Sequence, residues 1–147
     1  MQKAPEFDLL FLLRILESGE KIKLYSYGFT DAIEFFEAHD QKDFNACLSL
    51  LAQIVEQANK VSDETKKQYS ELDWEKMYSY RNRIVHDYTG IDKFITFEII
   101  QNSIPELVNL LVEVIRDSVR QSRFKSEDLD LSRNSPYLRH IDFDLFG

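Results

Sequence analysis

The chain has 147 residues, a mass of 17.4 kDa and a net charge of −8 at pH 7, with hydrophobic residues at 44% and charged residues at 30%. This composition is typical of a globular protein with a hydrophobic core. No stretch reaches the roughly 18 to 20 uncharged apolar residues that a membrane-spanning helix needs, and no signal-peptide pattern is present. We therefore expect a cytoplasmic protein without a membrane partner.

The acidic balance argues against a broad basic surface that would follow a nucleic-acid backbone. The acid is unevenly distributed: residues 1–59 carry 5 Lys or Arg and 10 Asp or Glu, whereas residues 60–93 carry 7 of each. Any contact with RNA should therefore use a small site, helped by nearby lysines, which are Lys60, Lys66, Lys67 and Lys76. The single cysteine, Cys47, cannot form an internal disulfide, and its apolar helical surroundings predict a core residue.

Four glycines and three prolines leave little material for tight turns, so we predict an all-α chain with no clear strand. The first helix should run from about Glu6 to about Tyr25 and be buried on two sides, one of which we expect to be able to face a second subunit. Thr30 and Asp31 should cap a short helix, and Asp40 should begin a longer one.

Residues 62–72 are polar and predict a connection with one helical turn. Asp73 should cap the next helix, which we expect to continue until Gly90. A last helix should run over residues 94–120 with a kink near residues 101–102, because Pro105 has no amide hydrogen to donate. We assign residues 1–122 to a helical bundle and residues 123–147 to a C-terminal tail that is either flexible or docked as an irregular arm.

The helix ending at Gly90 contains an unusually polar stretch, YRNRIVHDYTGID. At about 100° per residue, Arg81 and Tyr88 should lie on nearly the same face, and Asn82 and His86 should form a neighbouring row. These four residues would then form one polar wall near the end of the helix. The two apolar residues within the stretch, Ile84 and Val85, should point into the core.

This wall suits phosphoryl transfer with an internal nucleophile. His86 can take a proton from a ribose 2′-hydroxyl or return one to the leaving 5′-oxygen, and Arg81 can hold the scissile phosphate. No metal is required. The plainer alternative is a helix-capping histidine beside a surface ion pair. His39 and His140 have no comparable neighbours and are interpreted as ordinary surface or loop residues.

The sequence RNRIVHDY fits the pattern RxxxxHxY, with Arg81, His86 and Tyr88 at the fixed positions and Asn82 after the arginine. It resembles the HEPN superfamily, specifically the HepT-like ribonuclease toxins of bacterial and archaeal toxin–antitoxin pairs. The segments LLFLLRILESGEKIKLY, LSLLAQIVEQANKVSDETKKQY, LDWEKMYSYRNRIVHDYTGID and IPELVNLL extend the likeness over residues 6–120.

The resemblance implies a compact up-and-down bundle of four to five helices that forms a homodimer, with two motifs at one cleft. It implies metal-independent, cofactor-free endoribonuclease activity, with RNA such as tRNA as the substrate. His86 would act as acid and base, Arg81 would contact the phosphate, and Asn82 would orient one or both. Arg83 would be either a second phosphate contact or a surface charge.

The resemblance also implies a partner, a small nucleotidyltransferase antitoxin that adds AMP to the motif tyrosine, here Tyr88, as in a type VII-like system. A bulky anionic group beside Arg81 and His86 would occupy the space that the RNA phosphate needs. Two alternatives remain open. The first is a non-catalytic HEPN subunit that binds a nucleotide or a nucleotidyltransferase, and the second is a helical bundle without a site.

Overall fold

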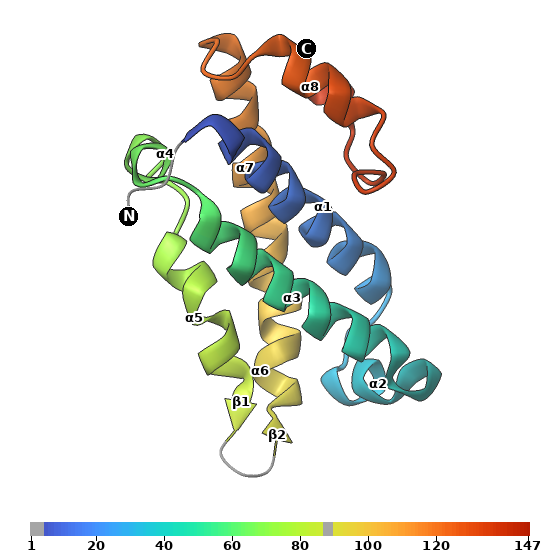
Figure 1. The fold of residues 1–147 in the computed structure, drawn as a ribbon. Helices are drawn as coiled ribbons and strands as arrows, with labels where there is room; N and C mark the ends of the chain where they lie inside the picture. The colour runs from blue at the N-terminus through green and yellow to red at the C-terminus, as the bar shows by residue number, and fades with distance from the viewer. Residues whose placement is uncertain (1–4, 87–89) are drawn as a thin grey trace.

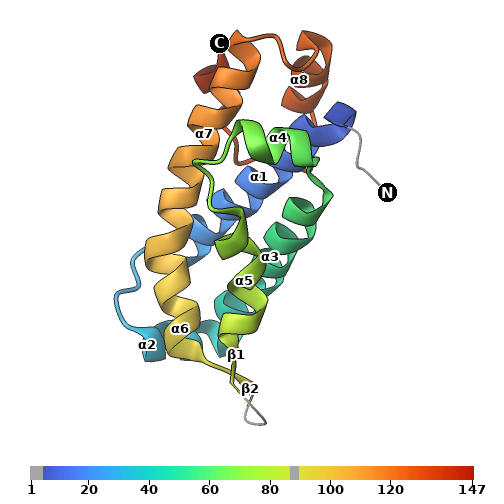
Figure 2. The same cartoon turned by 90° about the vertical axis from the view of Figure 1, so that its left-hand side faces the viewer.

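The computed structural model describes residues 5–86 and 90–147, without the side chain of His86. Over this part of the chain the fold is all-α, as predicted, and four long helices form a bundle around one core (Figures 1 and 2). These helices are α1 (Asp8–Ser26), α3 (Lys42–Lys60), α5 (Trp74–Ile84) and α7 (Ile104–Arg120).

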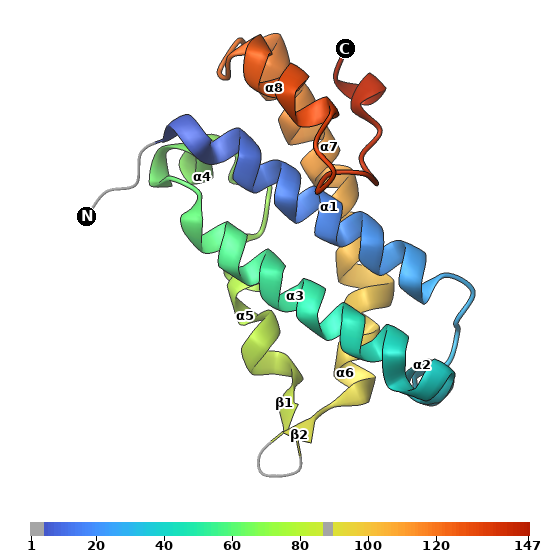
Figure 3. The same cartoon turned by 45° about the vertical axis from the view of Figure 1, so that its right-hand side comes forward.

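Helix α1 lies at the centre of the packing, in contact with α3 along its length and with α7 on another side (Figure 3). It follows a single 3₁₀ turn, η1 (Pro5–Phe7), and its buried positions spread over most of its circumference. Cys47 of α3 is fully buried in the same core, as predicted.

Two of the three predicted caps are correct. The Asp31 side chain accepts a hydrogen bond from the Glu34 amide and begins α2 (Ala32–Glu37), and the Asp73 side chain accepts one from the Lys76 amide and begins α5. The prediction for Asp40 is wrong. His39, Asp40 and Gln41 all have positive φ angles, so the turn η2 (Ala38–Gln41) reverses the chain and α3 begins at Lys42.

A buried carboxylate fastens the start of α1 to the segment after α3. Asp8 is fully buried and accepts hydrogen bonds from the amide of Ser62 at 3.0 Å, from the Ser62 hydroxyl at 2.5 Å and from the Thr65 hydroxyl. Ser62 also caps the short helix α4 (Asp63–Gln68), the helical turn predicted within residues 62–72.

A π-helical turn precedes Pro105, at the position where the sequence predicted a kink. The chain runs from α6 (Lys93–Glu98) through a π-helical turn, η3 (Ile99–Ser103), into α7 without interruption. Since proline lacks the amide hydrogen that the Gln101 carbonyl would accept, the hydrogen-bond register shifts within the preceding turn.

Residues 123–147 form a docked arm, one of the two possibilities that the sequence left open. The arm contains α8 (Ser126–Arg133) and the turn η4 (Phe143–Phe146), and it lies beside α1 and the end of α7 (Figure 3). Five of its apolar side chains are buried, namely Leu129, Leu138, Ile141, Phe143 and Phe146. The Arg116 Nε of α7 also donates a hydrogen bond to the Leu145 carbonyl at 3.0 Å.

Candidate functional site

The motif helix ends earlier than predicted. Helix α5 stops at Ile84, and a two-residue strand, β1 (Val85–His86), pairs antiparallel with β2 (Gly90–Ile91). The Ile84 carbonyl accepts a hydrogen bond from the Asp92 amide at 2.7 Å, which closes the base of this hairpin. The helix does not continue for another turn, because the backbone is extended at the β-branched Val85 and forms hydrogen bonds across the hairpin instead.

Two predictions are therefore wrong. The expected helical row of Asn82 and His86 does not form, because His86 lies on a strand beyond the helix end. Val85 is 57% exposed instead of buried, whereas Ile84 does point into the core. Gly90 does have a positive φ of 104°, but it begins β2 and does not end the helix.

Arg81 and Asn82 occupy the last turn of α5, and both are exposed. Trp74, Met77 and Tyr80 form the buried side of the helix, and Arg81, two turns after Trp74, lies at the edge of that side. Within the described chain, neither Arg81 nor Asn82 forms a side-chain hydrogen bond or an ion pair, so a guanidinium and an amide face solvent at the foot of the hairpin.

Arg83 lies on a different side of the helix from Arg81. Two residues along an α-helix correspond to a turn of about 200°. Burial raises the pKa of the Tyr80 hydroxyl to about 12. The positive charge of the half-buried Arg83 opposes this rise, and the negative charge of Glu106 on α7 adds to it. Arg81 and Arg83 therefore do not share one face of α5.

The remaining two motif residues are His86 and Tyr88. The backbone of His86 pairs with Gly90 across the hairpin, but its side chain lies outside the described residues. Tyr88 lies outside them entirely. Their assigned roles stay predictions.

The surroundings of the hairpin include residues that sequence reasoning missed. Val85 and Ile91 are cross-strand partners and are 57% and 40% exposed, and Phe94 at the start of α6 is 58% exposed. The Lys93 ammonium lies 5.6 Å from the centre of the Phe94 ring and 4.9 Å from that of Phe36. In the sequence, this exposed group is indicated only by the apolar residues that follow Gly90.

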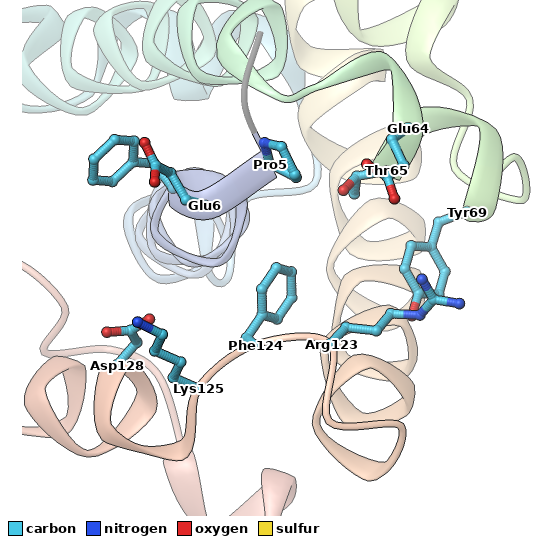
Figure 4. Close-up of a pocket in the computed structure, with 10 residues that line it drawn as sticks. Pro5, Glu6, Glu64, Thr65, Tyr69, Arg123, Phe124, Lys125 and Asp128 are labelled. Carbon is cyan, nitrogen blue, oxygen red and sulfur yellow. The ribbon is translucent and has the colours of Figure 1, made fainter.

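A hollow of about 640 Å³ lies at the other end of the molecule, between the start of α1, α4 and the connection from α7 to α8 (Figure 4). Its charges are mixed, because Arg123 and Lys125 line it together with three acids, Glu6, Glu64 and Asp128. It is remote from the hairpin (Figure 1) and indicates no single class of ligand.

The other two histidines differ from each other. His39 is exposed and contacts Asp43 through Nδ1 at 2.6 Å, as expected for a surface residue. His140 is more than an ordinary loop residue, because its backbone amide and its Nδ1 both contact the buried carboxylate of Glu17, at 2.7 and 2.6 Å. Nothing in the sequence indicates this pairing, since 123 positions separate the two residues.

Within residues 5–86 and 90–147, and without the His86 side chain, no three His, Cys, Asp or Glu side chains gather in a way that could hold a metal ion. Over the same part of the chain, every helix is too short or too polar to cross a membrane.

Comparison with known proteins identifies the family. Residues 15–114, more than half of the chain, match the family model described as Ribonuclease HepT-like. The chain therefore belongs to the HepT-like ribonuclease family, whose relationship to HEPN proteins agrees with the all-α bundle. The matched region contains all of α5 and the hairpin, and it ends before the C-terminal arm. Membership of this family supports a ribonuclease function.

Several curated relatives come from Methanocaldococcus jannaschii. Putative RNase MJ0127 is 29% identical over 115 residues, which cover 77% of this chain and 92% of the relative. Putative RNase MJ1380 is 24% identical over 66% of this chain and 86% of its own length. Gamma-glutamylcyclotransferase and putative RNase MJ0434 is 25% identical over 87% of this chain, which spans only 51% of that longer protein. No solved structure matches.

Proposed function

We propose that this protein is a metal-independent endoribonuclease toxin of a type VII-like toxin–antitoxin pair. The observation that carries the proposal is the family match over residues 15–114, which include Arg81, Asn82 and His86. The names of the M. jannaschii relatives also support an RNase. Two further features support this site: Arg81 and Asn82 are exposed and form no side-chain hydrogen bond or ion pair with the described residues, and the hairpin carries His86.

In the proposed reaction, His86 removes the proton from a ribose 2′-hydroxyl, and the 2′-oxygen attacks the adjacent phosphorus. The bond from phosphorus to the 5′-oxygen breaks, and the protonated His86 returns its proton to that oxygen. The products are a 2′,3′-cyclic phosphate and a 5′-hydroxyl end. Arg81 stabilises the charge that develops on the phosphate, and Asn82 orients His86 or the phosphate.

The active unit in this proposal is a homodimer in which two hairpins face one cleft. A cleft of this kind would compensate for the net charge of −8, because it brings two copies of Arg81 close to one RNA strand. The substrate class is RNA, including tRNA.

The decisive experiment compares the wild type with His86→Ala on a labelled tRNA pool in EDTA, followed by analysis of the RNA ends. We expect cleavage with 2′,3′-cyclic phosphate ends by the wild type and none by His86→Ala or Arg81→Ala, with all three dimeric. His39→Ala is the matched control, since it removes an exposed histidine elsewhere. Equal cleavage by His86→Ala would contradict the mechanism, and the absence of cleavage by a folded wild-type dimer would favour the non-catalytic binding subunit.

Regulation in this proposal acts through Tyr88. Its hydroxyl oxygen attacks the α-phosphorus of ATP on a nucleotidyltransferase antitoxin, and pyrophosphate leaves. The added AMP then blocks the phosphate site of Arg81. After incubation with the partner and ATP, mass spectrometry should detect AMP on the wild type and on Tyr27→Phe, which changes an exposed tyrosine, but not on Tyr88→Phe. An adduct that persists in Tyr88→Phe would assign the modification elsewhere.

A further inference from the structure

The exposed apolar side chains beside the motif have no role in the reaction described above. Val85 and Ile91 are cross-strand partners in the hairpin, Phe94 follows three residues after Ile91, and each keeps at least two fifths of its surface exposed. Single exposed apolar residues need no explanation, but a group of them beside a proposed active site does.

The positions of these residues are fixed relative to the motif helix. The Asp92 amide bonds to the Ile84 carbonyl at the end of α5, and the Asp92 side chain accepts hydrogen bonds from the amides of Phe94 and Ile95 at 3.0 Å. The start of α6 is therefore tied to α5 through one residue. Phe94 presents its ring on the first turn of α6, while Phe97, three residues later, is buried.

Two cations lie near this apolar group along the chain. The Lys93 ammonium contacts the rings of Phe36 and Phe94, and Arg81 lies on the last turn of α5, just before the hairpin. Among the residues that the structure describes, neither cation has a carboxylate within ion-pairing distance. Within that part of the chain, both charges are available to an anionic ligand.

Resting on the function proposed above, we propose that Phe94 and Lys93 form an RNA-binding platform beside the motif. The Phe94 ring would stack on the base of a nucleotide next to the scissile phosphate, and the Lys93 ammonium would contact the neighbouring phosphate. Exposed aromatic rings beside cations are the usual means of holding single-stranded nucleic acid. In the homodimer proposed above, the platform would line the RNA cleft and lie outside the subunit contact itself, because direct contact across a twofold axis would press like cations together, whereas RNA neutralises them.

The platform is tested by RNA binding in the full-length His86→Ala background, with a fluorescent single-stranded RNA and with tRNA. Loss of one base-stacking ring should weaken binding by about 10-fold to 100-fold in Phe94→Ala, and Phe94→Tyr should restore it. Lys93→Gln should weaken binding and reduce the slope of log Kd against log salt by about 0.7. Phe7→Ala is the matched control, because Phe7 is equally exposed, at 58%, at the other end of the molecule.

Equal affinity of Phe94→Ala and its parent would overturn the platform, as would an absence of RNA binding by the parent. Light scattering on the same samples gives the third outcome: a change of molar mass in Phe94→Ala would assign the ring to a subunit contact and also overturn it. The two proposals fail separately, because cleavage by the wild type tests the ribonuclease and binding in the His86→Ala background tests the platform.

Discussion

Gly19 of α1 packs directly against Val108 of α7: a Cβ atom at position 19 would lie 2.7 Å from Val108 Cγ2. The absence of a side chain therefore allows the two helices to approach each other closely. Gly19→Ala should destabilise the fold by roughly 1–3 kcal/mol despite the better helix propensity of alanine, because the helices must separate. Urea unfolding measures this cost, and Arg14→Ala, at an exposed position of the same helix, should change little. A Gly19→Ala variant that is more stable than the wild type would show that the two helices accommodate the added methyl group without loss of stability.

Asp8 should be among the most sensitive polar residues of the core. Asp8→Ala removes the acceptor for the amide and hydroxyl of Ser62 and for the hydroxyl of Thr65, and should cost about 2 kcal/mol or more. Asp8→Asn should cost less, because its amide oxygen can still accept from the Ser62 amide. Chemical denaturation gives both values, and the exposed Asp63→Asn serves as the control. If Ala and Asn are equivalent at position 8, the hydrogen bonds contribute little.

The contact between Glu17 and His140 should control how firmly the arm is held. The amide that bonds to Glu17 belongs to the peptide bond after Arg139, a site of tryptic cleavage. His140→Ala and Glu17→Gln should therefore accelerate cleavage there, while the bundle stays intact. Limited proteolysis with mass analysis follows this change, and His39→Ala should leave the rate unaffected. Unchanged protection in both variants would assign the docking of the arm to its apolar residues alone.

Stability should fall at alkaline pH. Burial raises the pKa of the Cys47 thiol from 9.0 to about 12 and that of the Tyr80 hydroxyl from 10.0 to about 12. Above about pH 9 the unfolded chain therefore binds fewer protons than the folded one, and the free energy of unfolding decreases as pH rises towards 12. Urea unfolding from pH 8 to 11 tests the slope, which Cys47→Ala should reduce. Native Cys47 should also resist alkylation at pH 8, and rapid labelling would contradict its burial.

Local signals in the sequence predicted most of the helices. Asp31 and Asp73 cap their helices because each carboxylate reaches an amide only three residues ahead, and Pro105 disturbs the turn directly before it. The HepT-like family was likewise recognisable from the motif and the flanking helices.

Features that depend on distant partners could not be predicted in this way. The end of α5 at Ile84 depends on a hydrogen bond from Asp92 and on strand pairing, which the helical periodicity of the stretch conceals. The bond between Glu17 and His140 joins opposite parts of the chain. The exposed Phe94 follows the motif closely, but its exposure is visible only once α6 is placed.

The described residues of the hairpin lie outside the hydrophobic core. Val85, Gly90 and Ile91 are exposed, and burial resumes only at Thr96 and Phe97 on α6. Residues that contribute little to burial can change at a small cost in stability. The bundle can therefore tolerate substitutions at these described positions, so the RNA contacts proposed for the hairpin can be altered by mutation while the scaffold stays the same.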